Sequence, residues 1–479
     1  MFEVLLFLVA AIVMLGILVA YDGSRDVFHP LVILGPMLLF LYCWMPLKLL
    51  QNGGLDRFFN MEQLQFVQTL NVLGVLGFVL LCLWVGVRLC EPPIAPTTIS
   101  PRVARRLLLG AALCGTIGFV CWGITIVEVG GFTAAFSSSY SGGYDSSGYV
   151  RDGAMLLLVA VLLSMTSLSA GGPRVTGILL TVIFATPWAL TALLMGRRGP
   201  TFNLAIVLLM GWYINRRKRP PILLVGTAGL VLGWFVLFLV TNRSQLYLGS
   251  DFNFKTDVSS EVEKPDTGNE FIYGTGTVLS AQRRNHYFWM RRYLAQILIR
   301  PIPTAIWATK YEDFGVPELL FNAGTGEGFG DTLGWQGAVG SAPGIIADFW
   351  LEVWWFAPVL MALVGFGYGF VWKKAVTQGG PWATQYVVLS ALSIYLVMQT
   401  GEAVIFRTLE LSIPCWLAWK WALLSPRSEL SGVFIPPRRQ HFLRTGAAEQ
   451  GDSIPQAKST GLALPCVPFP SDLGSAPHA

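Results

Sequence analysis

Long, unbroken apolar runs constrain this chain more than any other feature of its sequence. About eleven runs, each of about 16 to 27 residues, match the length that a helix needs to span the hydrocarbon core of a bilayer. A soluble chain would instead break its apolar residues into stripes of period 2 or 3.6. Hydrophobic residues make up 53% of the chain and charged residues only 13%. An ordinary soluble chain carries roughly twice that charged fraction, so the sequence predicts an all-α, polytopic membrane protein with about eleven transmembrane helices.

The apolar runs divide the chain into four parts. The predicted spans are residues 2–20, 29–46, 66–87, 107–128, 154–170, 175–195, 200–215, 222–240, 345–371, 382–400 and 404–424. The predicted parts are N-terminal transmembrane helices over 1–240, one large extracytoplasmic loop over 241–344, C-terminal transmembrane helices over 345–424 and a disordered cytoplasmic tail over 425–479. The tail is rich in proline and small polar residues and has no periodic pattern, which is typical of disorder.

Clusters of lysine and arginine in short loops predict which side of the membrane each loop occupies. The clusters are Arg102, Arg105 and Arg106, then Arg216, Arg217, Lys218 and Arg219, and finally Lys373 and Lys374. Because such residues are retained in the cytoplasm, the N-terminus is expected outside and the C-terminus inside. Membrane spans separate the clusters, which therefore form no continuous basic face and argue against a nucleic-acid partner.

Arg197 and Arg198 lie in a short outer turn between two predicted spans, against the trend of the other basic residues. Ionised groups so close to the bilayer are costly and usually functional. One interpretation is that both side chains reach to lipid headgroups. The other is that they neutralise the charge that develops on a diphosphate leaving group. The sequence leaves both interpretations open.

A basic, aromatic segment over residues 271–311 lies in the predicted outer loop and contains no acidic residue. Its cations are Arg283, Arg284, Arg291, Arg292, Arg300 and Lys310. An amphipathic helix in the membrane interface explains this composition without chemistry. A site for an anionic headgroup also explains it, because arginine binds phosphate oxygens in a bidentate way. The spacing of Arg284 and Arg291 would place them on one helix face, if a helix forms here.

Two carboxylates and one histidine are the candidate bases. Asp348 and Glu352 lie one turn apart at the outer end of the ninth predicted span, so they share a helix face. His286 is the one histidine in a predicted outer loop, where a lone histidine is most often only a polar loop residue. Glycosyl transfer needs a base for the attacking hydroxyl, but an internal salt-bridge network would explain the two acids equally. A further charged cluster opens the eleventh predicted span and comprises Glu402, Arg407 and Glu410.

The chain lacks the sequence signatures of metal and cofactor sites. Its seven cysteines include no CxxC pair, and none lies in the large outer loop, so they are expected to be packing residues. No HExxH or other paired-histidine set occurs. The glycines of 326–330 resemble a phosphate-binding loop only superficially, since no GKS/T signature accompanies them. The sequence therefore predicts neither a metal nor another cofactor.

Four short stretches within residues 107–375 carry a family resemblance. They are the glycine pair 130–131 with Arg151 beyond it, 194–200 with the basic exit 213–218, 302–310, and 344–350 leading to the glycines of 365–367. In these stretches the chain resembles oligosaccharide repeat-unit polymerases of the O-antigen polymerase (Wzy-type) family. Thr304 stands where that family often has an arginine, and 355–357 reads Trp-Phe-Ala where Asn-Phe-Gly is expected.

The resemblance implies a glycosyltransferase C-type helical fold acting at the outer face of the bacterial cytoplasmic membrane. The growing glycan would be transferred from its lipid to an incoming undecaprenyl-diphosphate-linked repeat unit, without nucleotide sugar or metal. The outer arginines and Lys310 would bind the diphosphate, and Asp348, Glu352 or His286 would orient or deprotonate the acceptor hydroxyl. Membrane lipids, a flippase and a chain-length regulator are the expected partners of such a polysaccharide polymerase.

Three other functions stay open from the sequence. An O-antigen ligase-like enzyme would use the same donor with a different acceptor. A lipid-linked glycan flippase or other transporter predicts short loops, internal symmetry and charges near the membrane midplane, whereas here the charges crowd the predicted outer face. A non-catalytic assembly partner of a synthase complex would tolerate the loss of individual arginine and aspartate residues.

Overall fold

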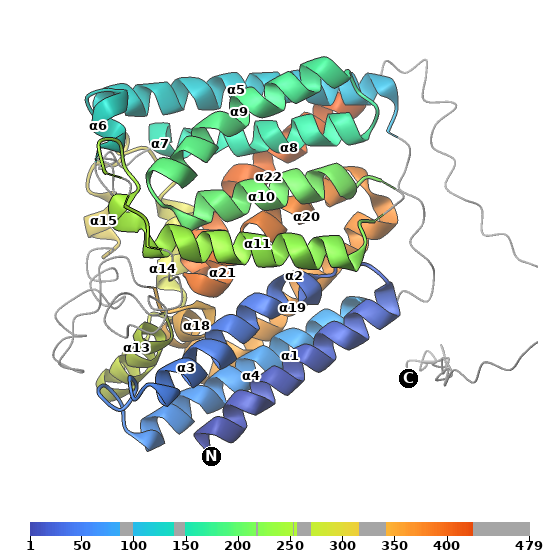
Figure 1. Ribbon diagram of the computed structural model, residues 1–479. Coiled ribbons are helices and arrows are strands. Elements are labelled where there is room, and N and C mark those ends of the chain that lie inside the picture. The colour runs from blue at the N-terminus through green and yellow to red at the C-terminus, as the bar shows by residue number, and fades with distance from the viewer. Residues whose placement is uncertain are drawn as a thin grey trace, which may run out of the picture. The chain divides into compact units, whose positions relative to one another are not determined.

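The described part of the chain is entirely helical in its regular structure (Figure 1). The computed structural model describes residues 1–86, 99–137, 149–216, 219–251, 253–255, 270–315 and 342–424. The helices before residue 215 are α1 (Phe2–Ser24), α2 (Pro30–Leu39), η1 (Phe40–Trp44), α3 (Met45–Gln51), α4 (Met61–Gly86), α5 (Pro101–Glu128), α6 (Phe132–Phe136), α7 (Tyr149–Gly153), α8 (Leu156–Ser169), α9 (Arg174–Leu194) and α10 (Arg198–Tyr213). The later helices are α11 (Ile222–Thr241), η2 (Arg243–Gln245), α13 (Glu270–Arg284), α14 (Arg291–Leu294), η3 (Ala295–Ile299), α15 (Lys310–Asp313), α18 (Ile345–Val353), η4 (Trp354–Phe356), α19 (Ala357–Gln378), α20 (Gly380–Ala391), α21 (Ser393–Met398) and α22 (Gly401–Leu423). The predicted tail 425–479 and most of the glycine-rich run 324–344 lie outside the described residues.

Nine helical segments within those ranges are long and apolar enough to cross a membrane, which confirms a polytopic helical membrane protein. Large apolar side chains point away from the protein on several of them, as contact with lipid requires. Leu113, Val175 and Leu223 are 65%, 81% and 79% exposed, respectively. Such exposure over whole helix faces would be unfavourable in water.

The two other predicted spans, α10 and α22, differ from these nine segments. α10 has 16 residues, fewer than the about 20 that span hydrocarbon. It packs against α8, α9, α11 and α20. α22 has 23 residues but includes charged side chains at Glu402, Arg407, Glu410 and Lys420. Both helices belong to the bundle. The short length of α10 and the charged side chains of α22 distinguish them from the nine segments.

α4 and α19 form the tightest helix pair, and α1 packs on α4 as well. Glycines make this approach possible. A Cβ atom on Gly365 would lie 2.2 Å from the carbonyl oxygen of Phe78, and one on Gly369 would lie 2.9 Å from that of Cys82. Small residues at such crossings let helix backbones approach closely inside a membrane.

A second set of helices is built around α8, whose residues 157–167 are all buried. α5, α9 and α10 pack on it, and α20 and α22 connect this set to the rest of the bundle. The Trp419 indole N–H of α22 donates to the Thr384 hydroxyl of α20 at 2.8 Å. This bond satisfies a buried polar group that lipid or apolar side chains could not.

A buried aspartate joins the first loop to two distant segments. Asp26 is 3% exposed and accepts hydrogen bonds from the Phe28 amide at 3.0 Å and from the Trp372 indole N–H at 3.1 Å. Arg219 pairs with it at 3.2 Å and also donates to the carbonyl oxygens of Tyr213 and Ile214. The loop before α2 is thereby fixed against α10 and α19.

The predicted span 345–371 is broken in the structure. α18 ends at Val353, where Trp354 has a φ of +55°, and α19 begins at Ala357. The backbone N–H groups of Phe288 and Trp289 donate to the last-turn carbonyl oxygens of α18, at 2.8 and 2.7 Å. These bonds satisfy carbonyls at the end of α18. The helix cannot continue through residue 354, because Pro358 has no N–H to donate to the Trp354 carbonyl and its ring would clash with that carbonyl.

Figure 1 places α6, α13, α14, α15 and α18 together at one end of the helix bundle, at the left of the view. We call this the α13–α18 end. α10 also begins here, since Arg198 contacts the first residue of α13. α5 begins and α19 finishes at the opposite end.

Candidate functional site

Arg292 is the centre of a buried charge network at the α13–α18 end. It lies in α14, is 3% exposed, and donates from Nη2 to Asp348 Oδ1 and from Nε to Glu352 Oε1, both at 2.5 Å. Burial would lower the pKa of Arg292, but the charges of Asp348 and Glu352 outweigh it and raise that pKa. The side chain is therefore a permanent cation. The salt-bridge network that the sequence left as one explanation of the two acids is present.

Asp348 ties three separate helices together. Its Oδ2 accepts hydrogen bonds from the Tyr293 hydroxyl and from the Gly401 backbone N–H, the latter at 2.8 Å. Burial raises the pKa of Tyr293, and the charge of Asp348 raises it further, so the hydroxyl stays protonated and donates. A Cβ atom on Gly401 would lie 2.6 Å from the Tyr293 hydroxyl oxygen, which is why glycine opens α22. Asp348 thus fixes the start of α22 against α14 and α18.

A second group of cations lies near Tyr395. Arg197 precedes α10 and Arg198 begins it. The next residue, Gly199, packs so closely on Tyr395 that a Cβ atom there would lie 2.1 Å from the hydroxyl oxygen. Arg407 of α22 stacks on the Tyr395 ring, with its guanidinium carbon 4.6 Å from the centroid. Arg198 also pairs with the buried carboxylate of Glu270. We call Arg197, Arg198, Arg407 and Tyr395 the arginine cluster.

Arg300 links the basic segment to two of the helices. It pairs with Asp152 of α7 at 2.8 Å and donates to Gln296 Oε1 at 3.0 Å. Its guanidinium carbon lies 3.8 Å from the centroid of Phe406 on α22. Gln296 in turn donates to Glu402, which also lies 3.9 Å from Arg292. Glu402 therefore stands between the buried network and the arginine cluster on α22.

Lys310 is buried, with 1% of its surface exposed. Its ammonium donates to the carbonyl oxygens of Ile299 and Arg300, at 3.2 and 3.1 Å, and to that of Ile302. These carbonyls follow η3, where a positive charge satisfies unpaired acceptors at a helix C-terminus. Lys310, a predicted phosphate ligand, therefore binds backbone carbonyls at the C-terminal end of η3.

Three other predicted cations of the segment are exposed and lie on two different helices. Arg283 and Arg284 end α13, Arg291 begins α14, and the intervening residues include positive φ values at Asn285, Trp289 and Met290. Arg284 and Arg291 therefore do not share a helix face. Arg291 donates to the Phe314 carbonyl at 3.5 Å.

His286 is exposed, and its ring packs edge-on against Phe288 at 5.3 Å between centroids. It follows the C-terminal end of α13, whereas Glu270, the partner of Arg198, opens that helix. A 15-residue helix is about 22 Å long at 1.5 Å per residue. The structure therefore does not bring His286 to the arginine cluster.

Apart from the exposed Arg283, Arg284 and Arg291, the cations at this end fall into two classes. Arg292 and Lys310 are buried and saturated by carboxylates or carbonyls. Partly exposed guanidinium groups come from separate elements and are those of Arg197, Arg198, Arg300 and Arg407. Partly buried arginines form stronger, charge-assisted hydrogen bonds to phosphate oxygens than fully solvated ones. This second class is the part of the site that can bind an anion.

Sequence patterns did not point to several residues that build the site. Tyr395 lies inside an apolar run, Tyr293 adjoins a pair of arginines, and Gly401 is one of many glycines. The charged triplet of Glu402, Arg407 and Glu410 was the one available signal for this part of α22. Among the described residues no group of three or more His, Cys, Asp or Glu side chains could hold a metal ion.

Comparisons with protein-family models, with curated proteins and with solved structures found no match to this chain. The fold and the site define its class directly. It is a polytopic helical membrane protein with a buried charge network and an arginine cluster at one end of the bundle.

Proposed function

We propose that this protein is a membrane glycosyltransferase that polymerises undecaprenyl-diphosphate-linked oligosaccharide repeat units at the outer face of the bacterial cytoplasmic membrane. In this proposal about eleven helices, α10 and α22 included, form a glycosyltransferase C-type bundle. The α13–α18 end and the N-terminus face outward, and the C-terminus is cytoplasmic. The basic residues Arg102, Arg106 and Lys373 support this orientation, because they belong to the opposite ends of α5 and α19.

The arginine cluster is the observation that carries the proposal. Arg407 stacks on the Tyr395 ring, and Arg197 and Arg198 lie at the start of α10, whose Gly199 packs against the Tyr395 hydroxyl. Like charges repel, so such a group is favoured by nearby acids or by a bound anion. Glu270 pairs with Arg198, and the charge of Arg407 acts on Glu410. A lipid-linked diphosphate reaches this depth and carries the negative charge that the cluster would neutralise.

The proposed reaction is a direct displacement at the sugar. A hydroxyl oxygen of the incoming repeat unit attacks the anomeric carbon of the growing glycan. The bond from that carbon to the diphosphate oxygen breaks, and its electron pair stays on the leaving undecaprenyl diphosphate. The hydroxyl proton passes to a base. Arg197, Arg198 and Arg407 stabilise the charge that develops on the leaving group.

The surroundings of the carboxylates suggest which of them position helices and which one acts as the base. Asp348 and Glu352 are fully buried and held by Arg292, so we assign them to positioning α14 and α22. Glu402 touches the same network but keeps 18% of its side chain exposed, and it shares α22 with Arg407. We assign Glu402 as the base, because it contacts the network, is partly exposed and lies on the helix that carries Arg407.

Complementation of a deletion strain tests this function. The gene is deleted in its host and replaced by wild type, Arg407→Gln, Glu402→Gln or the control Arg174→Gln, which changes an exposed arginine at the start of α9. Lipid-linked glycan is then extracted and sized, with the membrane level of each variant measured. We expect single repeat units in the deletion strain, restoration by the control, and about 100-fold or greater loss of polymer in the two site variants.

Each alternative function gives a different outcome. Long polymer that accumulates on undecaprenyl diphosphate in the deletion strain would show a ligase-like enzyme instead. Unchanged polymer in the deletion strain, or full restoration by both site variants, would refute glycosyl transfer at this site.

A further inference from the structure

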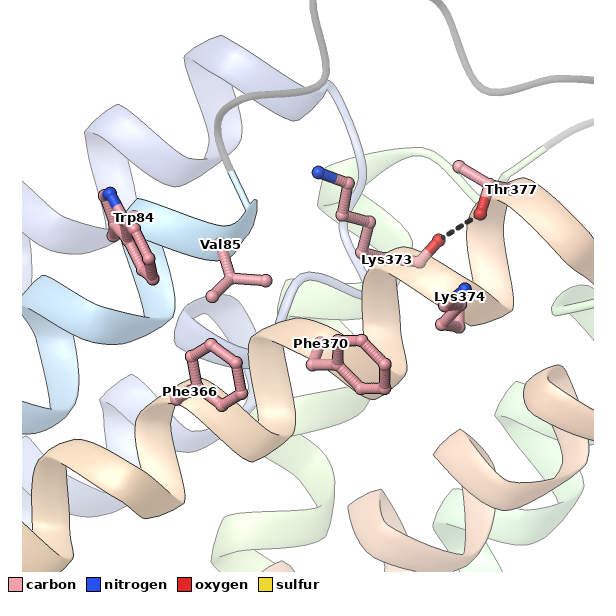
Figure 2. Close-up of a pocket in the computed structure, with 7 residues that line it drawn as sticks. All are labelled: Trp84, Val85, Phe366, Phe370, Lys373, Lys374 and Thr377. Atoms are coloured by element: carbon pink, nitrogen blue, oxygen red, sulfur yellow. Dashed lines mark hydrogen bonds between the residues drawn. The ribbon is translucent and has the colours of Figure 1, made fainter. Parts of the chain in front are cut away.

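A second site lies at the opposite end of the bundle, in a groove between α4 and α19. Figure 2 shows its walls, with Trp84 and Val85 on α4 and with Phe366 and Phe370 on successive turns of α19. The groove encloses about 360 Å3, which lies within the usual size of ligand sites of about 300–1,000 Å3. Its lining is almost wholly apolar along the helices.

The aromatic rings form a continuous wall. The centroids of Trp84 and Phe366 are 6.3 Å apart, and those of Phe366 and Phe370 are 6.2 Å apart with nearly parallel planes. Trp84 is 53% exposed, so the wall faces the surroundings of the helices rather than a neighbouring helix. In a membrane those surroundings are acyl chains, and aromatic side chains concentrate where chains meet headgroups.

Two lysines close one end of this wall. Lys373 and Lys374 follow Phe370 on α19, and the Lys374 ammonium lies 5.7 Å from the centroid of the Phe370 ring. In Figure 2 the Thr377 hydroxyl beyond them donates to the Lys373 carbonyl, at 2.7 Å. An apolar wall that ends in two cations matches a molecule with apolar chains and a negatively charged head.

We infer that this groove binds an anionic phospholipid, with an acyl chain along Trp84, Phe366 and Phe370 and the phosphate at Lys373 and Lys374. The complementarity of charge selects this occupant. A lysine near a membrane surface attracts anionic lipid, and here two lysines stand beside a groove of fixed shape. The inference does not depend on the proposed reaction, since none of the groove residues belongs to the buried charge network or the arginine cluster.

Native mass spectrometry of the full chain in detergent tests the inference. The protein is titrated with phosphatidylglycerol and, separately, with phosphatidylcholine. We expect tighter binding of phosphatidylglycerol by wild type and about tenfold or greater weakening in the double variant Lys373→Gln/Lys374→Gln. The control Lys420→Gln removes a lysine that lies over Trp416 on α22, 5.0 Å from the ring centroid, and should bind as wild type does.

Three results would overturn the inference. Equal binding of the two lipids by wild type would mean that another occupant, such as a protein or a chain segment, covers the groove. Equal weakening of phosphatidylglycerol binding by Lys420→Gln would show that the lipid is attracted to any basic surface of the protein. Displacement of phosphatidylglycerol by the same concentration of glycerol phosphate would show a site for free phosphate, because that competitor has no acyl chains to fill the groove.

Discussion

Arg291 and Arg292 are neighbours in the chain but lie in different surroundings. Arg291 is exposed, whereas Arg292 is buried between Asp348 and Glu352. An arginine removed from water is stable only while its charge is matched, and the two carboxylates equally depend on it. Of the two arginines, Arg292 therefore contributes more to the stability of the fold.

Replacing Arg292 should destabilise the protein far more than replacing its neighbour. Arg292→Gln leaves Asp348 and Glu352 buried without their cation, so we expect a loss of about 3–5 kcal/mol in the free energy of unfolding. Arg291→Gln should change it by about 0.5 kcal/mol or less. Titration of both variants with SDS in mixed micelles, followed by tryptophan fluorescence, measures the difference. Similar losses in the two variants would contradict the buried network.

Tyr293 should make stability depend on alkaline pH. The unfolded chain releases its phenolic proton near the ordinary pKa of 10.0, while the folded protein keeps it because burial and Asp348 raise that pKa. The folded state then binds more protons, so this contribution is complete below pH 10.0 and is lost as the pH rises toward the folded pKa, at up to about 1.4 kcal/mol per pH unit.

Tyr293→Phe removes this group and provides the comparison. SDS titrations from about pH 9 to about pH 11.5 should show a steeper loss of stability for wild type than for the variant. Parallel pH profiles would mean that the Tyr293 hydroxyl is not held by Asp348.

The break between α18 and α19 has a local and a tertiary cause. By hydropathy the apolar run 345–371 predicts one long helix, but Pro358 within it is a local signal for a new helix start. The amides of Phe288 and Trp289, which belong to the basic segment, also bind the last carbonyls of α18. The membrane-spanning helices were predictable because their signal is local. At this junction the proline was a usable local signal, whereas the amides that bind the end of α18 come from a distant part of the chain.

The candidate site was also predictable only in part. Arginines, two acids and their approximate end of the bundle followed from composition and topology. The sequence did not predict which cations are buried. Lys310 and Arg292 are buried because the fold brings carbonyls to the first and carboxylates to the second. The place of His286 depends on the direction of α13, which no sequence pattern specified.

Two glycines on α19 offer a matched test of the α4–α19 crossing. A Cβ atom on Gly365 would meet the Phe78 backbone at 2.2 Å, whereas one on Gly367 meets nothing within 4 Å. We expect Gly365→Ala to separate the helices and destabilise the protein by about 1–3 kcal/mol. Gly367→Ala should be neutral or stabilising by up to about 1 kcal/mol, since alanine favours a helix. Equal effects in the SDS titration would contradict the close crossing.

At the scale of the whole molecule, the two ends of the bundle carry different chemistry. The α13–α18 end gathers arginines and acids from α7, α10, α14, α18 and α22 into connected contacts. The opposite end carries the Asp26 junction and the lysine-ended groove. The proposed diphosphate site and the proposed lipid groove therefore lie at different ends of the bundle.

Reconstitution of the purified protein measures the central claim most directly. Vesicles that contain the protein are supplied with lipid-linked single repeat units, and the glycan products and free undecaprenyl diphosphate are quantified together. The account predicts a ladder of longer glycans with one undecaprenyl diphosphate released for each new linkage, and neither product with Glu402→Gln. Single units that cross the membrane without lengthening, and with no release of undecaprenyl diphosphate, would contradict it and identify a transporter.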